Sequence, residues 1–278
     1  MPELPEMRAL AERLEARLQG EALENFRAYS FSFLKTVQPT PEALVGSTVA
    51  ALHSRGKYLV WSFGNDLRTL VHLGNAGRLD LETPPKATKP KGALARFVFG
   101  RQAVLIREHG SERRAGLWVL GPGDDGVLAA LGPEPFEEGF AELIANSGDR
   151  RHLHTVLRDQ HSVAGIGRGY ADDALNRAGL SPFATLAGLD TAGRTRLLDA
   201  VRSVLAEALD AERQRVGGLS ETSLGDRFLV HRRAGSPCPR CGRRLERVAF
   251  ESHEIVYCPT CQTAGQVLAD RRLSRLLR

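Results

Sequence analysis

The sequence predicts a multidomain α+β protein, and three observations support this class. A helical repeat of apolar residues opens the chain, short strand-like runs follow, and a second helical stretch precedes a short segment that holds all four cysteines. We expect an N-terminal β-sandwich with a flanking helix over residues 1–131, a helical domain over 132–226, a cysteine-rich finger over 227–265 and a basic tail over 266–278.

The N-terminal domain is predicted from a change in apolar period. Residues 3–19 place apolar side chains at spacings of three and four, and Gly20 follows where a helix would end. Between about residues 43 and 120, runs such as Tyr58–Phe63 alternate with Gly, Asn and Pro turns. These strands are expected to form a sandwich on which the first helix packs.

The second helical stretch begins after Gly132-Pro133. Its clearest element is an apolar stripe from Leu197 to Leu209, with Asp190 or Thr191 available as the helix cap and an end expected near Gly217-Gly218. The tail from Gly265 to Arg278 suggests a short basic helix.

Composition and charge restrict the class of partner. In the 278-residue chain no apolar run reaches membrane-spanning length and no secretory signal is visible, so we expect a cytoplasmic protein without a membrane partner. The net charge is +5, but residues 227–278 hold eleven Arg and no Lys against four acids, a net of +7, which leaves −2 for the remainder. A basic C-terminal module fits nucleic acid or a merely solvated tail equally well.

The four cysteines form two CxxC pairs, Cys238/Cys241 and Cys258/Cys261. Two such pairs can place four thiolates tetrahedrally around one structural zinc ion, with no position left open for water. Two disulfides or free thiols are the alternatives, and a cytosolic location argues against disulfides. We expect one zinc ion and no organic cofactor.

Two further motifs suggest chemistry. Removal of Met1 would expose the secondary amine of Pro2, which can attack a sugar C1′ while Glu3 moves protons; alternatively, Pro2 and Pro5 merely start a helix. The turn Gly165–Asp173 opens a helix and carries Arg168, which suits a DNA phosphate, although glycine turns before helices are common.

Taken together, these motifs resemble the formamidopyrimidine-DNA glycosylase and endonuclease VIII family. The matching blocks come in family order over nearly the whole chain: Pro2–Glu6 (PELPE), Arg55–Leu59 (RGKYL), His72–Leu79 (HLGNAGRL), Arg113–Gly116 (RRAG), Gly165–Asp173 (GIGRGYADD) and Tyr257–Gln262 (YCPTCQ). The resemblance implies a helix-two-turn-helix domain, a zinc-ribbon finger and a monomer that acts on damaged DNA.

The resemblance also implies a function and a set of residues. It implies a DNA glycosylase with AP lyase activity, in which the N-terminal proline is the Schiff-base nucleophile on a flipped-out nucleotide. Its catalytic residues would be Pro2, Glu3, Glu6 and Lys57, the last at a phosphate beside the lesion. Its DNA-binding residues would be His72, Asn75, Arg113, Arg114, Gly167, Arg168, Tyr170 and His253.

Several positions depart from the family pattern. The family fills the hole left by the flipped base with a Met, an Arg and a Phe, whereas this chain has Asn75, Arg113 and Ala115. The family Asn of the glycine turn is Arg168, and the Arg of the finger hairpin is His253. The segment 217–228 is also short. We therefore expect a glycosylase for bulky, cross-linked or single-strand lesions rather than 8-oxoguanine, since such lesions need less wedge.

Two other classes stay open. The lost DNA-contact residues are also compatible with a non-catalytic damaged-DNA-binding protein on the same scaffold. An RNA- or protein-binding zinc ribbon beside an unrelated domain is disfavoured by the PELPE start.

Overall fold

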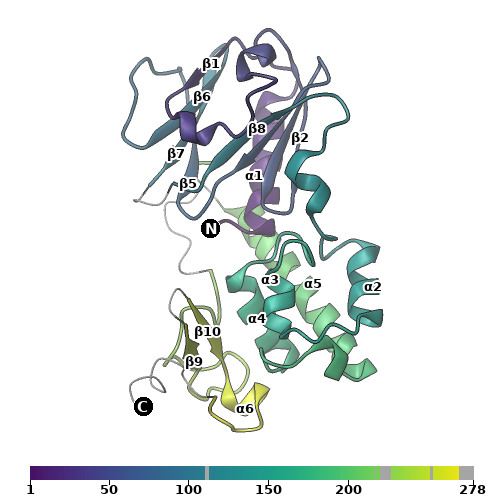
Figure 1. Cartoon of the computed structure of the whole chain (residues 1–278). Coiled ribbons are helices and arrows are strands. Elements are labelled where there is room, and N and C mark those ends of the chain that lie inside the picture. The colour runs from purple at the N-terminus through teal and green to yellow at the C-terminus, as the bar shows by residue number, and fades with distance from the viewer. Residues whose placement is uncertain (110–112, 216, 220–226, 251–252, 269–278) are drawn as a thin grey trace. The chain divides into compact units, whose positions relative to one another are not determined.

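The computed structural model describes residues 1–109, 113–215, 217–219, 227–250 and 253–268. They form two compact units, one built from Met1–Ala130 and Leu209–Leu224 and the other from Leu131–Ala208 and Gly225–Arg278 (Figure 1). The predicted α+β class is confirmed, while the segment bounds expected from the sequence stay a prediction. Among the described residues, no helix combines the length and apolar character needed to cross a membrane.

The first unit begins with helix α1, Leu4–Leu18. Pro5 lies in its first turn, where a missing N–H costs nothing, and Glu6 in the same turn suits the positive end of the helix dipole. The helix ends before Gly20, whose φ of +81° favours glycine. Its buried face carries Met7, Leu10, Leu14 and Leu18, the apolar repeat seen in the sequence.

Eight strands of this unit form two antiparallel sheets, in the orders β2-β3-β4-β8 and β1-β6-β7-β5. The strands are β1 Asn25–Ala28, β2 Val49–Arg55, β3 Tyr58–Phe63, β4 Arg68–His72, β5 Gly77–Glu82, β6 Ala93–Phe99, β7 Gln102–Glu108 and β8 Gly116–Leu120. The short 3-10 helices η1 Phe31–Phe33 and η2 Pro41–Leu44 lie between β1 and β2, and η3 Gly126–Ala130 follows β8. Figure 1 shows the sheets with α1 beside β2.

The core of the sandwich follows from the alternation along β3. Leu59, Trp61 and Phe63 belong to the main core with the apolar face of α1, whereas Val60 packs on the opposite face of the sheet with Leu120. The Trp61 ring lies 4.7 Å from that of Phe97 and 6.3 Å from that of Phe99, both on β6, so aromatic contacts join the two sheets.

The second unit contains a helical core and the finger. Its helices are α2 Glu138–Asn146, α3 Leu153–Arg158, α4 Arg168–Ala178, η4 Leu186–Gly188 and α5 Thr191–Gln214, whose last turns belong to the first unit. The predicted stripe on α5 is buried, and Asp190 caps that helix by accepting the Gly193 N–H at 2.7 Å. The helix ends at Gln214, earlier than the expected glycine pair.

The finger consists of hairpin β9 Glu246–Ala249 and β10 Glu254–Tyr257, followed by α6 Pro259–Gln262. Val230, Leu245 and Val256 pack with the cysteines in a small core of their own. The predicted tail helix lies outside the described residues from 269 onward, and so does most of the short segment after Gly217, at residues 220–226.

Candidate active site and metal centre

The predicted catalytic residues are buried at the start of α1. Pro2 is buried, and Glu3, Glu6 and Lys57 are 4%, 6% and 5% exposed, whereas Met1 is 39% exposed. The Glu3 N–H donates to Glu6 Oε2 at 2.7 Å, so Glu6 fixes the backbone that carries Glu3. Ionisable groups are seldom this buried without a partner or a function, which makes the helix start a candidate site.

His72, at the end of β4, lies near the start of α1 and contacts two loops. Its Nδ1 accepts the Gly74 N–H at 3.3 Å, its ring lies 5.0 Å from that of Tyr58, and a further hydrogen bond reaches the Arg114 backbone. Burial lowers the pKa of His72 to about 4, and the positive charges of Lys57 and of the chain's N-terminus act in the same direction. Lys57 and the N-terminus therefore lie near the same imidazole.

The loops that carry Asn75 and Arg113 lie against each other. A Cβ added to Gly74, which has φ +57°, would lie 2.9 Å from the Arg114 carbonyl carbon, so the close approach requires glycine. Glu108, which the sequence analysis did not single out, is buried and accepts the N–H groups of Arg114 and Ala115 at 2.8 and 3.0 Å. This carboxylate holds the second loop in place.

The three wedge positions differ in exposure. Asn75 and Arg113 are exposed, as is Arg114, whereas Ala115 is 4% exposed and packs in the sandwich core. The Ala115 methyl group therefore faces the core, and of the three positions only the polar Asn75 and Arg113 are exposed at the surface.

The glycine turn lies in the second unit and is held by Gln160. The side chain of Gln160 donates to the Ile166 carbonyl at 2.7 Å and accepts the Gly165 N–H at 3.0 Å, with Gly165 at φ +95°. Gly167 is the N-cap of α4 and Arg168 its first residue. The turn thus directs the N-terminal N–H groups of an eleven-residue helix and an Arg to one place, an arrangement that suits an anion.

Tyr170, predicted to bind DNA, is buried in the helical core. Its ring packs edge-on against Phe228 at 5.1 Å, and the Arg227 guanidinium lies 4.6 Å from the Phe228 ring. A Cβ on Gly169 would come within 2.1 Å of that ring, so glycine is required there by packing. These contacts hold the first turn of α4, and with it the glycine turn, against the helical core.

Two neighbouring acids join α4 to the finger, and neither was predicted. Asp173 accepts the N–H groups of Leu229, Val230 and His231 at 2.8, 2.9 and 3.2 Å. Burial nevertheless raises the pKa of Asp173, although those N–H groups oppose the shift. Asp172 Oδ2 lies 2.6 Å from His231 Nδ1, and its Oδ1 lies 3.3 Å from His154 Nε2.

The four cysteines form one cluster, with their Sγ atoms within 4.8 Å of one another and Cys241 and Cys258 3.6 Å apart. Tetrahedral zinc with Zn–S bonds of about 2.3 Å places sulfurs about 3.8 Å apart, so the cluster fits that ion. Burial opposes ionisation of Cys238, but N–H groups of Arg240 and Cys241 and the Asn176 side chain outweigh it and lower the pKa of Cys238 to about 7.

Asn176 on α4 and Gln262 on α6 support the cysteine cluster. Asn176 Nδ2 lies 3.6 Å from Cys238 Sγ and 3.0 Å from Gln262 Oε1, which also accepts the Cys258 N–H at 2.7 Å. Gln262 Nε2 donates to the Leu180 carbonyl at 2.9 Å. The sequence showed Gln262 only as the last letter of a motif, because Asn176 and Leu180, two of its three partners, are distant in the chain.

Comparison with known proteins decides the family. Residues 1–115 match the formamidopyrimidine-DNA glycosylase N-terminal domain, 131–218 its H2TH domain and 235–264 a zinc finger found in FPG and IleRS. The formamidopyrimidine-DNA glycosylase of Laribacter hongkongensis is 33% identical over 94% of this chain and its own full length. The chain belongs to the formamidopyrimidine-DNA glycosylase family.

Two other similar proteins show how much of the chain the similarity covers. An uncharacterised formamidopyrimidine-DNA glycosylase-like protein of Mycobacterium tuberculosis is 43% identical over 54% of this chain and 95% of its own. Lactococcus lactis Fpg (MutM), solved with an N7-benzyl-Fapy-dG containing DNA, has a TM-score of 0.81 at 25% identity over 94% of this chain and 99% of that one. The predicted family membership is confirmed, and with it DNA-glycosylase function as the class for this chain.

Proposed function

We propose that this chain is a bifunctional glycosylase and AP lyase that removes damaged bases from DNA through Pro2. The observation that carries the proposal is the burial of Pro2, Glu3 and Glu6 together at the start of α1, with the charges of Lys57 and the N-terminus acting on one histidine. A nucleophile, a proton donor and a cation for phosphate are what base removal needs.

The chemistry starts once Met1 is removed, because only then is the Pro2 nitrogen a secondary amine. Its lone pair forms a bond to C1′ of the extruded nucleotide, the bond between C1′ and the base breaks, and Glu3 supplies the proton that the departing base takes. Pro2 then loses its N–H proton, the C1′–O4′ bond breaks as O4′ takes up a proton, and the nitrogen lone pair forms the C1′=N iminium. The iminium acidifies the C2′ proton. When water or a basic side chain takes that proton, a C2′=C3′ bond forms, the C3′–O bond breaks and the phosphate ester leaves, which cuts the strand. Glu6 positions Glu3 through the 2.7 Å hydrogen bond.

The DNA contacts are assigned on the same basis. The exposed residues Asn75, Arg113 and Arg114 would enter or flank the duplex, with His72 positioning both loops. Gly167 and Arg168 would hold a phosphate at the start of α4, Tyr170 would support that turn, and His253 would contact the backbone from the hairpin. We propose that the protein acts as a monomer, which sedimentation at working concentrations tests.

We also propose that the four cysteines hold one structural zinc ion. Cys238, Cys241, Cys258 and Cys261 would bind it, and the ion would supply no reaction chemistry because four thiolates fill its coordination. Metal analysis of the purified protein should give one zinc per chain.

A preference for lesions that already disturb stacking is the finer proposal. It is supported by exposed Asn75 and buried Ala115 at two wedge positions, since unstacking a base step costs about a few kcal/mol that an apolar wedge offsets. One relative is described with an N7-benzyl-Fapy-dG containing DNA, a bulky lesion. Excision of 8-oxoguanine opposite cytosine should be slow compared with a bulky formamidopyrimidine, and Asn75→Met should raise the former rate. Equal rates in the unaltered protein would refute the preference.

The experiment for the main proposal is borohydride trapping on DNA with an abasic site. The Met1-free protein should form a covalent adduct that Pro2→Gly abolishes, whereas Glu3→Gln should retain trapping on the abasic site and lose base excision. If the unaltered protein binds this DNA but is never trapped, the alternative is favoured: a damaged-DNA-binding protein on a glycosylase scaffold.

A further inference from the structure

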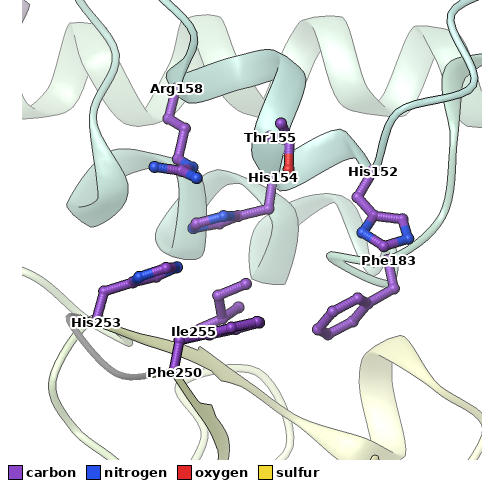
Figure 2. Close-up of a pocket in the computed structure, with 8 residues that line it drawn as sticks. All are labelled: His152, His154, Thr155, Arg158, Phe183, Phe250, His253 and Ile255. Atoms are coloured by element: carbon purple, nitrogen blue, oxygen red, sulfur yellow. The ribbon is translucent and has the colours of Figure 1, made fainter. Parts of the chain in front are cut away.

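A cavity of about 180 Å³ lies within the second unit, between α3 and the hairpin β9–β10 (Figure 2). It contains neither the predicted catalytic residues nor the cysteines. One part of its wall is basic and comes mainly from α3, with His154 and Arg158; the other is apolar, with Phe183, Phe250 and Ile255.

The basic wall contains buried polar atoms that lack hydrogen bonds. The His154 side chain is 2% exposed, and its Nε2 lies 3.3 Å from Asp172 Oδ1 without hydrogen-bonding geometry. Arg158 Nε is also buried, and it makes no hydrogen bond to any residue that the structure describes. Figure 2 shows these two side chains turned toward the space above His253. Buried donors of this kind are costly unless a ligand uses them.

Positive groups outnumber negative ones around this wall. Burial lowers the pKa of His253, and the positive charges of Arg168 and Arg158 lower it further, while the negative charge of Asp172 raises it. Asp172 already faces His231 through its second oxygen. The basic wall can therefore bind an additional anion. Arg168 lies near this wall and is also the first residue of α4, at the turn proposed to hold a DNA phosphate.

The apolar wall offers flat surfaces. The Phe250 ring stacks on the His253 ring, with centroids 4.6 Å apart and planes 7° from parallel, and Phe183 packs edge-on against His152 at 5.1 Å. Figure 2 shows Phe250 and Phe183 on the side of the cavity opposite α3. A planar aromatic group fits between such surfaces and gains stacking energy there.

We propose that this cavity binds one unpaired nucleotide of a DNA strand, with the base against Phe250 and Phe183 and the adjoining phosphate at Arg158, His154 and His253. The proposal rests on the proposed function for the presence of DNA, but it places a second base-reading site in the helical and finger unit, separate from the Pro2 site. Such a site favours DNA whose helix is already disrupted.

The test is a binding cycle with two duplexes that differ only in one bulged nucleotide. One carries an unpaired 2-aminopurine and the other an abasic tetrahydrofuran at the same position. Phe250→Leu keeps an apolar side chain but removes the stacking face, so it should raise Kd for the 2-aminopurine bulge roughly 5- to 150-fold and for the abasic bulge less than twofold. Phe136→Leu, which changes an exposed Phe outside the cavity, should alter neither.

Arg158→Gln should raise Kd for both bulges, because both keep the phosphate, while Arg196→Gln on the exposed face of α5 should not. Bound 2-aminopurine should lose fluorescence with the unaltered protein and keep it with Phe250→Leu. The proposal is overturned if Phe250→Leu affects both bulges equally or neither. Borohydride trapping separates this proposal from the proposed function. Phe250→Leu should still be trapped, because its Pro2 site is unchanged. If the unaltered protein is not trapped, only the proposed function is refuted.

Discussion

His72 should remain neutral far below the pH at which an ordinary histidine takes up a proton. Its side chain is largely buried, and the charges of Lys57 and the N-terminus add to the effect, so that its pKa is about 4 against an ordinary 6.5. Because Nδ1 accepts the Gly74 N–H, the single ring proton is on Nε2 and serves the Arg114 backbone. A neutral ring can thus hold both loops at physiological pH.

The magnitude follows from the two pKa values. A folded pKa below the unfolded one means that, between pH 6.5 and about 4, the unfolded chain binds the proton and the folded chain does not. This contribution to stability is complete above pH 6.5 and is lost as the pH falls through about 4, and the total loss is at most about 3 kcal/mol. His72→Gln should lack this acid-dependent loss.

The direct assay is NMR titration of the imidazole Cε1–H signals, with the His72 signal assigned by its absence in His72→Gln. We expect a midpoint near pH 4, and a higher midpoint in Lys57→Met because a positive neighbour has been removed. Lys86→Met, at an exposed lysine of the same unit, is the matched control and should change nothing. A midpoint near 6.5 in the unaltered protein, or one that ignores Lys57→Met, would refute the reasoning.

Three further changes test the second unit. Cys241→Ser should lower the zinc content and unfold the finger, measured by metal analysis and by loss of hairpin amide protection; retained protection would argue against a structural ion. Gly169→Ala should destabilise this unit in urea unfolding by about 1–3 kcal/mol through the clash with Phe228, despite a helix-propensity gain of about 1 kcal/mol, whereas Gly148→Ala, with open space around it, should be neutral. Asp173→Ala leaves three N–H groups without their acceptor and should cost about 3 kcal/mol or more, while exposed Asp199→Ala should cost little; equal effects of the two would contradict the role of Asp173 in joining α4 to residues 229–231.

Local patterns predicted the elements whose signal is local. The first helix was expected at 3–19 and is found at Leu4–Leu18, because its apolar period and Gly20 define it without help from other segments. Strand Asn25–Ala28 was not singled out, since only Phe26 of its four residues is buried and the strand depends on pairing with β6. Likewise, nothing in the sequence gives the order β1-β6-β7-β5, which is fixed by contacts between distant segments.

The candidate site shows the same contrast between local sequence signals and contacts made by distant segments. The CxxC spacing indicated the cysteine cluster directly, and the N-terminal motif suggested Pro2 and Glu3, whereas Glu6 and Lys57 were assigned only through the family resemblance. The supporting groups were missed because each acts on residues far away in the chain: Asp173 on the 229–231 backbone and Asn176 on Cys238. Glu108 is an intermediate case, since it lies only six residues before Arg114 but needs the loop to fold back on it.

The central claim is that the N-terminal amine of Pro2 is the nucleophile. The most direct measurement is peptide mass spectrometry of the borohydride-trapped protein–DNA adduct after digestion of both partners. We predict that the sugar remnant is attached to a peptide that begins at Pro2 and lacks Met1. Attachment to Lys57 or to any other lysine, or an adduct on a chain that still carries Met1, would contradict the claim.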